Sequence, residues 1–162
     1  MARILIVDDE PAALKVLTRL LAEHGCEARV AGTGPQALQA ARDSPPDLVL
    51  LDINLPEMDG YEICARLKAD ENMREIPVIF LSGLGETLDK VKAFGCGGVD
   101  YVGKPFSPVE VVTRVKTHLE LSAQRRRAHA CYLPHETPRS LLRLAHGKAP
   151  LTCLRWSKHW LS

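Results

Sequence analysis

The sequence lacks the features of membrane-spanning, exported and disulfide-stabilised proteins. None of its apolar runs approaches the roughly 20 residues that cross a bilayer, so we expect no membrane partner. The beginning, MARILIVDDE, has a single basic residue and places acids where a signal peptide would have its cleavage site. The five cysteines are odd in number and form no CxxC pair, which favours a reduced, cytoplasmic setting.

Charge is divided unevenly along the chain. Residues 1–121 carry 13 Lys and Arg against 19 Asp and Glu, a net charge of −6. Residues 122–162 carry 8 against 1, a net charge of +7. Such asymmetry indicates two physically different parts. We therefore expect one domain over residues 1–121, followed by a basic, poorly patterned tail or the start of an effector region over 122–162.

Residues 1–121 alternate between apolar runs and segments with helical periodicity. The runs predict strands at 3–7, 47–51, 77–81 and 99–103, with a short edge-like piece at 27–30. The periodic segments predict helices at 11–25, 34–44, 59–71, 86–95 and 107–123. Continuous apolar strands alternating with helices indicate a doubly wound α/β domain, with a five-stranded parallel sheet and helices on both faces. In that architecture, ligands bind at the carboxyl ends of the strands.

Polar residues follow the stronger predicted strands. Asp8 and Asp9 follow the first strand, Asp52 the third, Ser82 the fourth and Lys104 the fifth. Because the carboxyl ends of parallel strands meet at one edge, we expect these side chains in one crevice. Clustered acids repel one another unless a cation lies among them. Oxygen ligands suit Mg²⁺, which in proteins commonly bridges phosphoryl groups.

The same set of residues predicts phosphoryl chemistry. A carboxylate can act as a nucleophile and form an acyl phosphate. Asp52 is the best candidate for the acceptor, because it lies on the central strand and precedes a loop that can lend backbone groups. Lys104 and Ser82 would hold the remaining phosphoryl oxygens. Asp8 and Asp9 are the better metal ligands.

Four stretches together resemble a known family. ILIVDDE, LVLLDINLPEMDGYE, PVIFLSG and VDYVGKPFS are similar, in order and spacing, to the receiver domain of two-component response regulators. The resemblance covers residues 1 to about 121 and implies a flavodoxin-like sheet of strand order 2-1-3-4-5. It also implies that a histidine kinase or a phosphotransfer protein phosphorylates Asp52. Mg²⁺ would be bound by Asp8, Asp9, Asp52 and the backbone carbonyl of Asn54.

The resemblance assigns roles to other residues as well. Ser82 and Lys104 match the hydroxyl and the lysine that contact the phosphate. Tyr101 matches the aromatic residue that turns inward when the hydroxyl moves onto the phosphate, although packing on the sheet would explain it equally. The bond before Pro105 is expected to be cis. The domain would be a regulator rather than an enzyme, limited to its own phosphorylation and dephosphorylation. It would act on a downstream effector protein or effector domain.

Two other functions stay open. A Mg²⁺-dependent aspartyl-phosphate phosphatase or phosphotransferase typically has a second acid two residues after its nucleophile, where this chain has Asn54. A DNA-binding regulator could act through the basic tail. However, the tail's roughly 41 residues are too few for a winged-helix domain and contain no helix-turn-helix pattern. We therefore do not expect nucleic acid as a partner.

The last part of the chain carries weaker patterns. Arg125 to Arg127 indicate the solvated end of a helix that extends to about 127, and at most a short helix is expected near 139–146. A heptad-like seam of Val112, Val115 and Leu119 leaves a homodimer open. No zinc-site spacing fits the ligand-type residues His129, Cys131, His135 and Cys153.

Overall fold

The strands lie side by side in one parallel sheet. The structure, a computed structural model, describes residues 1–83 and 90–132. Within these residues the sheet is built from β1 (Ala2–Val7), β2 (Cys26–Ala31), β3 (Leu48–Asp52), β4 (Val78–Ser82) and β5 (Asp100–Gly103). The order β2-β1-β3-β4-β5 confirms the flavodoxin-like α/β sheet and its 2-1-3-4-5 order.

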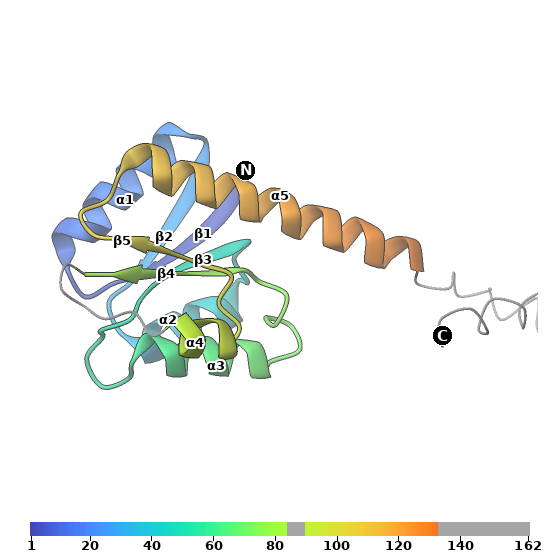
Figure 1. Ribbon diagram of the computed structural model, residues 1–162, viewed down its shortest axis with the longest axis horizontal. Coiled ribbons are helices and arrows are strands. Elements are labelled where there is room, and N and C mark those ends of the chain that lie inside the picture. Colours follow the sequence, from blue (N-terminus) through green and yellow to red (C-terminus); the bar gives the residue numbers. More distant parts are fainter. Residues whose placement is uncertain (84–89, 133–162) are drawn as a thin grey trace, which may run out of the picture. The chain divides into compact units, whose positions relative to one another are not determined.

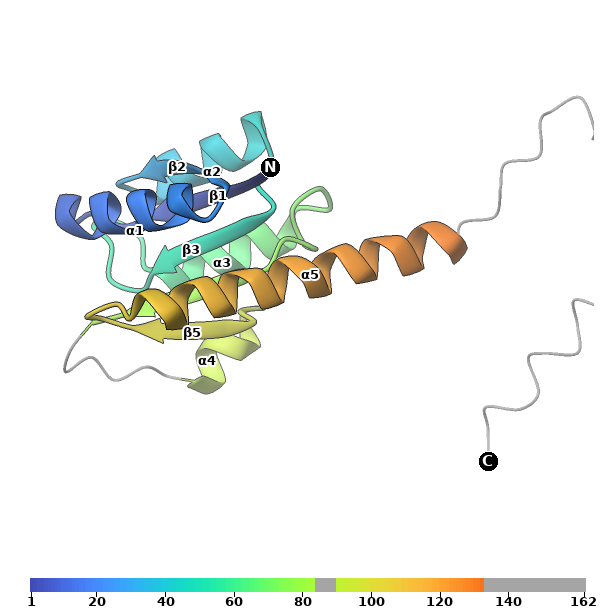
Figure 2. The ribbon, with the colours of Figure 1, turned by 90° about the horizontal axis from the view of Figure 1, so that it is seen from above.

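Helices cover both faces of this sheet, as the alternating pattern predicts. One face carries α1 (Pro11–Glu23) and α5 (Pro108–Tyr132) (Figures 1 and 2). The other face carries α2 (Gly34–Asp43), α3 (Gly60–Ala69) and α4 (Lys90–Gly95). Within the described residues, no helix has the length and apolarity of a membrane span.

Alternate residues of the strands supply two separate cores. On β1, Leu5 and Val7 belong to the core under α2, α3 and α4, whereas Ile4 and Ile6 belong to the core under α1 and α5. All four side chains are fully buried, and each contributes about 1.5–3 kcal/mol of burial free energy. Burial on both faces explains why the strands appear in the sequence as continuous apolar runs.

Most elements begin and end within two residues of their predicted ends, but two helices differ. The helix predicted at 86–95 is described only from Lys90, because residues 86–89 lie outside the described residues. Helix α5 continues to Tyr132, past the predicted end near 127. No glycine or proline interrupts the chain between Pro108 and Tyr132, so nothing local stops the helix. The expectations at 139–146, His135 and Cys153 also lie outside the described residues.

The heptad-like seam on α5 has a different origin from the one that the sequence suggested. Val115 is buried, and Val112 and Leu119 pack against the core under α1 and α5. The spacing therefore reflects the packing of α5 on its own sheet. The spacing gives no support for a second helix that packs against these residues.

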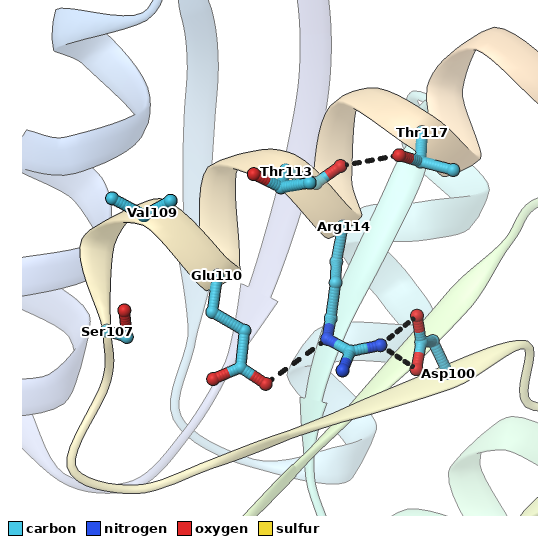
Figure 3. Close-up of a pocket in the computed structure, with 7 residues that line it drawn as sticks. All are labelled: Asp100, Ser107, Val109, Glu110, Thr113, Arg114 and Thr117. Atoms are coloured by element: carbon cyan, nitrogen blue, oxygen red, sulfur yellow. Dashed lines mark hydrogen bonds and ion pairs between the residues drawn. The ribbon is translucent and has the colours of Figure 1, made fainter.

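Charged side chains tie β5 to α5. The Arg114 guanidinium donates to both carboxylate oxygens of Asp100, at 2.6 and 2.7 Å, and to Glu110 at 3.2 Å (Figure 3). His118 Nε2 lies 3.0 Å from Asp100. Burial raises the pKa of Asp100, but the hydrogen bonds from Arg114 and His118 outweigh it, so the pKa is lowered on balance. The carboxylate therefore stays ionised and holds the helix to the sheet.

A tight loop connects β3 to α3. The Met58 N–H donates to the Pro56 carbonyl at 2.8 Å, and Glu57 between them has φ of +71°. The Gly60 N–H donates to the Ile53 carbonyl at 2.8 Å and draws the start of α3 against the end of β3. A Cβ at Gly60 would lie 2.3 Å from the Asp52 carbonyl oxygen, so only glycine fits there.

Replacing Gly60 by alanine should therefore destabilise the fold. The new methyl group has no space, and we expect the free energy of unfolding to fall by about 1–3 kcal/mol in urea titrations. Gly95→Ala is the matched control, because a Cβ there meets nothing within 4 Å. That variant should be unchanged or gain up to about 1 kcal/mol, since alanine favours helix. Equal stability of the two variants would contradict this account of the loop.

Candidate functional site

The first acid of the site is buried at the end of β1. Asp8 follows Val7 directly and its side chain is 0% exposed. Its N–H donates to the Ala31 carbonyl at 3.1 Å, which continues the pairing of β1 with β2. Its Oδ1 accepts the Glu10 N–H at 2.9 Å. A buried carboxylate costs free energy unless it is paired with a cation or well hydrogen-bonded.

Lys104 supplies that pairing. Its Nζ lies 2.8 Å from Asp8 Oδ2, 3.2 Å from Asp52 Oδ2 and 3.7 Å from Glu10 Oε2. The Lys104 N–H donates to the Ser82 carbonyl at 2.7 Å, and the bond to Pro105 is cis, the isomer that the resemblance implies. Burial lowers the pKa of the Lys104 ammonium, but the two aspartates outweigh burial and raise it on balance. Lys104 is therefore a permanent cation.

Asp52 ends β3 and is 4% exposed. Its Oδ1 accepts the Asn54 N–H at 3.1 Å, and its Oδ2 faces Lys104. Burial, and then the charge of Asp8, raise the pKa of Asp52 to about 6, while Lys104 and the Asn54 N–H act in the opposite direction. The carboxylate is mostly ionised at neutral pH, yet more basic than an ordinary aspartate.

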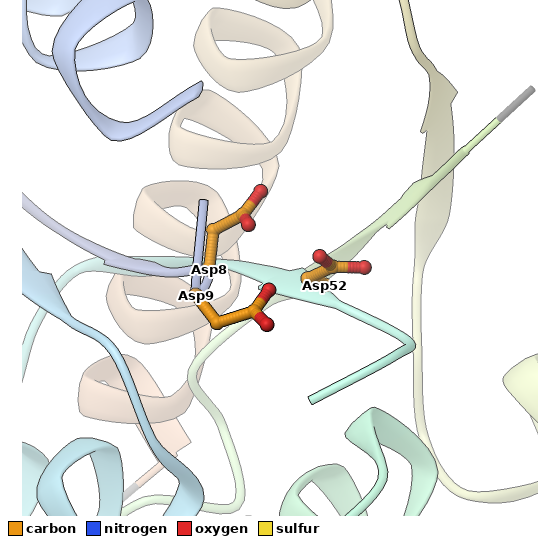
Figure 4. A group of neighbouring side chains, drawn as sticks. All are labelled: Asp8, Asp9 and Asp52. Carbon is orange, nitrogen blue, oxygen red and sulfur yellow. The ribbon is translucent and has the colours of Figure 1, made fainter. Parts of the chain in front are cut away.

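The three acids form a group with the character of a cation site. Oxygens of Asp8, Asp9 and Asp52 lie within 4.8 Å of one another at the ends of β1 and β3 (Figure 4). Asp8 Oδ2 is buried, and the Lys104 ammonium lies 2.8 Å from it. Hard oxygen donors with unused acceptor capacity fit Mg²⁺. The residues present therefore suit that ion.

The remaining predicted residues lie at different distances from this group. Ser82 is the last residue of β4, pairs with Gly103, and is half-buried at the same edge of the sheet. Asn54 begins the exposed loop after Asp52. Tyr101 lies further back on β5, opposite Phe80, and packs against the core under α2, α3 and α4. The structure thus gathers the acids and Lys104 directly, with Tyr101 behind them.

Two residues of the site had no role in the sequence-based prediction. Glu10 approaches Lys104 from the exposed side. Gly60 closes the loop against the Asp52 carbonyl. An acid two residues after Asp8 and a glycine after Asp59 are the only sequence signals for them, and both are common in loops.

The doubly wound sheet, with acids and a lysine at its carboxyl edge, has the arrangement that the resemblance to receiver domains implies. The chain belongs to the response regulator receiver domain family, whose family model matches residues 4–116. It is thus a domain of two-component signal transduction, as the four sequence stretches implied.

The relatives agree with this assignment. The chain is 44% identical over 117 residues to the DNA-binding response regulator MtrA of Mycolicibacterium smegmatis, covering 72% of this chain and 50% of that protein. It is 40% identical over 119 residues to the DNA-binding dual master transcriptional regulator RpaA of Synechocystis, covering 74% and 49%. A crystal structure of the signal receiver domain of a histidine kinase from Syntrophus aciditrophicus matches with a TM-score of 0.68 and 36% identity, covering 74% and 91%.

This chain spans about half the length of the curated relatives that it matches. The matched part corresponds to the receiver domain. Both relatives are named as DNA-binding or transcriptional regulators, which is at odds with the expectation that nucleic acid is not a partner.

The raised pKa of Asp52 predicts how stability depends on pH. Because the folded-state pKa of about 6 exceeds the ordinary value of about 4, folding opposes ionisation and stability falls as pH rises between these values. Asp52→Asn removes the charge. Without divalent cations, we expect its free energy of unfolding to exceed the parent's by about 1–3 kcal/mol at neutral pH, and the difference to vanish near pH 4. Urea unfolding in a chelator at both pH values measures it.

Asp9→Asn is the matched control for this experiment, because Asp9 belongs to the same acidic group but is exposed. Its effect should be much smaller. If Asp52→Asn is no more stable than the parent at neutral pH, burial does not oppose ionisation of Asp52.

Proposed function

We propose that Asp52 accepts a phosphoryl group from the phosphohistidine of a histidine kinase or phosphotransfer protein. The observation that carries this proposal is a buried, mostly ionised carboxylate with a permanent ammonium 3.2 Å away. Asp52 would attack phosphorus through a carboxylate oxygen, and the bond to the donor's imidazole would break. A basic carboxylate is the better nucleophile, and the pKa of about 6 leaves it deprotonated at neutral pH.

Mg²⁺ would be held by Asp8, Asp9, Asp52 and the backbone carbonyl of Asn54. When bound, it would neutralise charge on the phosphoryl oxygens. Lys104 would move its ammonium from the carboxylates onto a phosphoryl oxygen, and its permanent charge suits that role. The fit of the acidic group to a hard cation supports this assignment.

Phosphorylation of Asp52 would change the surface that binds the downstream partner. The Ser82 hydroxyl would move onto the phosphate, and Tyr101 would turn inward from β5. The region of α4, β5 and α5 would then change its affinity for an effector protein or effector domain. Exposed apolar side chains in this region support a partner there, namely Val91, Phe94 and Val109. A homodimer through the same region is the alternative partner.

The domain would regulate rather than turn over substrates. Position 54, where an aspartyl-phosphate phosphatase needs its second acid, is asparagine. We therefore expect only self-phosphorylation from small donors and self-dephosphorylation, in the cytoplasm where such kinases act. The proposed division is a receiver domain at 1–121 and a basic segment at 122–162.

Phosphorylation can be tested directly. Incubating the protein with an acyl phosphate and Mg²⁺ should add one phosphoryl group in intact-mass measurements, and Asp52→Asn should abolish the addition. Asp43→Asn is the control, because Asp43 is an exposed aspartate on α2, and it should label like the parent. Labelling of Asp52→Asn at the parent's rate would defeat the proposal. Sustained hydrolysis of a phosphomonoester would instead favour the phosphatase alternative.

DNA binding is a second candidate function, favoured by the names of the relatives and by the exposed Arg125 to Arg127 on α5. If these arginines neutralise DNA phosphates, binding should weaken steeply with salt. Replacing all three by glutamine should then abolish binding in a gel-shift assay. Binding that survives this change, or that ignores salt, would exclude the arginines as the DNA contact.

A further inference from the structure

Two cysteines from separate elements meet on the face covered by α2, α3 and α4. Cys64 lies on α3 and is fully buried, whereas Cys96 follows α4 and is half-buried. The Cys64 thiol donates to the Cys96 carbonyl, with 3.3 Å between sulfur and oxygen. The Cys96 thiol donates to the Ala93 carbonyl at 3.1 Å. Two thiols 32 residues apart in sequence therefore share one packed region.

Close packing fixes the segment that carries Cys96. Gly97 has φ of +103°, and a Cβ there would lie 2.7 Å from Lys68 Cγ on α3. A Cβ on Gly98 would lie 2.4 Å from a ring carbon of Phe80 on β4. The backbone after Cys96 therefore rests directly on α3 and β4. The fold itself holds Cys96 beside Cys64.

One of the two thiols can be reached from solvent. Cys96 lines a cavity of about 370 Å³, large enough for a small oxidant, and its charged lining is mostly cationic, with Lys68, Arg74 and Arg125 against one acid, Glu75. A partly exposed thiol among cations is typical of oxidisable cysteines. Burial, and then the neighbouring Cys96, raise the pKa of Cys64 to about 12, so Cys64 stays protonated and shielded. Oxidation would therefore begin at Cys96.

We propose that Cys64 and Cys96 are an oxidisable pair that closes to an intramolecular disulfide when a hydroperoxide reaches Cys96. In the first step, the Cys96 sulfur attacks one oxygen of hydrogen peroxide and the O–O bond breaks, giving a sulfenic acid and water. In the second, the Cys64 sulfur attacks the Cys96 sulfur and the S–O bond breaks. The Cys64 proton leaves with the hydroxyl as a second water. The two thiols lose two electrons, and the peroxide gains them.

The bond would tie α3 to the connection between α4 and β5. In a reducing compartment such a disulfide is transient, which suits a reversible restraint. This modification does not depend on phosphorylation of Asp52. It can therefore be tested without a kinase or a phosphodonor.

The test uses the full chain with Cys26, Cys131 and Cys153 replaced by serine, so that Cys64 and Cys96 alone remain. The folded protein is treated with hydrogen peroxide, denatured, alkylated with N-ethylmaleimide and weighed. We expect a monomer that has lost two hydrogens and takes up no alkylating agent, and dithiothreitol should restore both thiols. Peptide mapping of the oxidised parent chain, which carries no substitution, should recover the Cys64–Cys96 cross-link.

Two further variants separate the steps. Cys64→Ala should leave Cys96 as a sulfenic acid that dimedone traps, and Cys96→Ser should leave Cys64 reduced after the same treatment. The proposal is overturned if both thiols of the two-cysteine protein are alkylated after oxidation. It is also overturned if the disulfides in the parent chain join only separate molecules.

Discussion

The ion pairs of Lys104 with Asp8 and Asp52 hold the site together. The fold buries the carboxylates of Asp8 and Asp52 at one edge of the sheet, where unpaired charges would each cost several kcal/mol. One ammonium compensates both. Because β4 lies between β3 and β5, the Lys104 side chain has to pass the end of β4 to reach the acids. The small residue there, Ser82, suits that crossing. The strand order and the length of the Lys104 side chain together allow one ammonium to neutralise both buried carboxylates.

The loop after Asp52 meets a second requirement, which is to hold the Asp52 carboxylate in place. Asn54 donates to one carboxylate oxygen, and Gly60 brings the start of α3 onto the backbone of Asp52. Asp59 caps α3 by accepting the Glu62 N–H at 2.8 Å. The positive φ of Glu57 costs about 1 kcal/mol, and the surrounding hydrogen bonds offset it. Backbone strain at Glu57 is therefore part of the loop that fixes the position of the Asp52 carboxylate.

Much of the fold could be predicted from the sequence because burial on both faces leaves apolar runs that periodicity detects. The convergence of Asp8, Asp52 and Lys104 followed from the topology of parallel strands. Other features depend on contacts between distant segments, which spacing does not show. The seam of Val112, Val115 and Leu119 has the same spacing whether it faces a second helix or its own sheet. The contact between Cys64 and Cys96 depends on where α4 ends, and no sequence motif predicts it.

The ammonium among the acids has a consequence for any metal ion that enters. Lys104 Nζ already lies 2.8 Å from the buried oxygen of Asp8, so an incoming cation has to compete for that oxygen. A bound metal ion would therefore replace the Lys104 ammonium as the partner of this oxygen. The net free energy of its binding is smaller than the attraction of bare carboxylates would suggest.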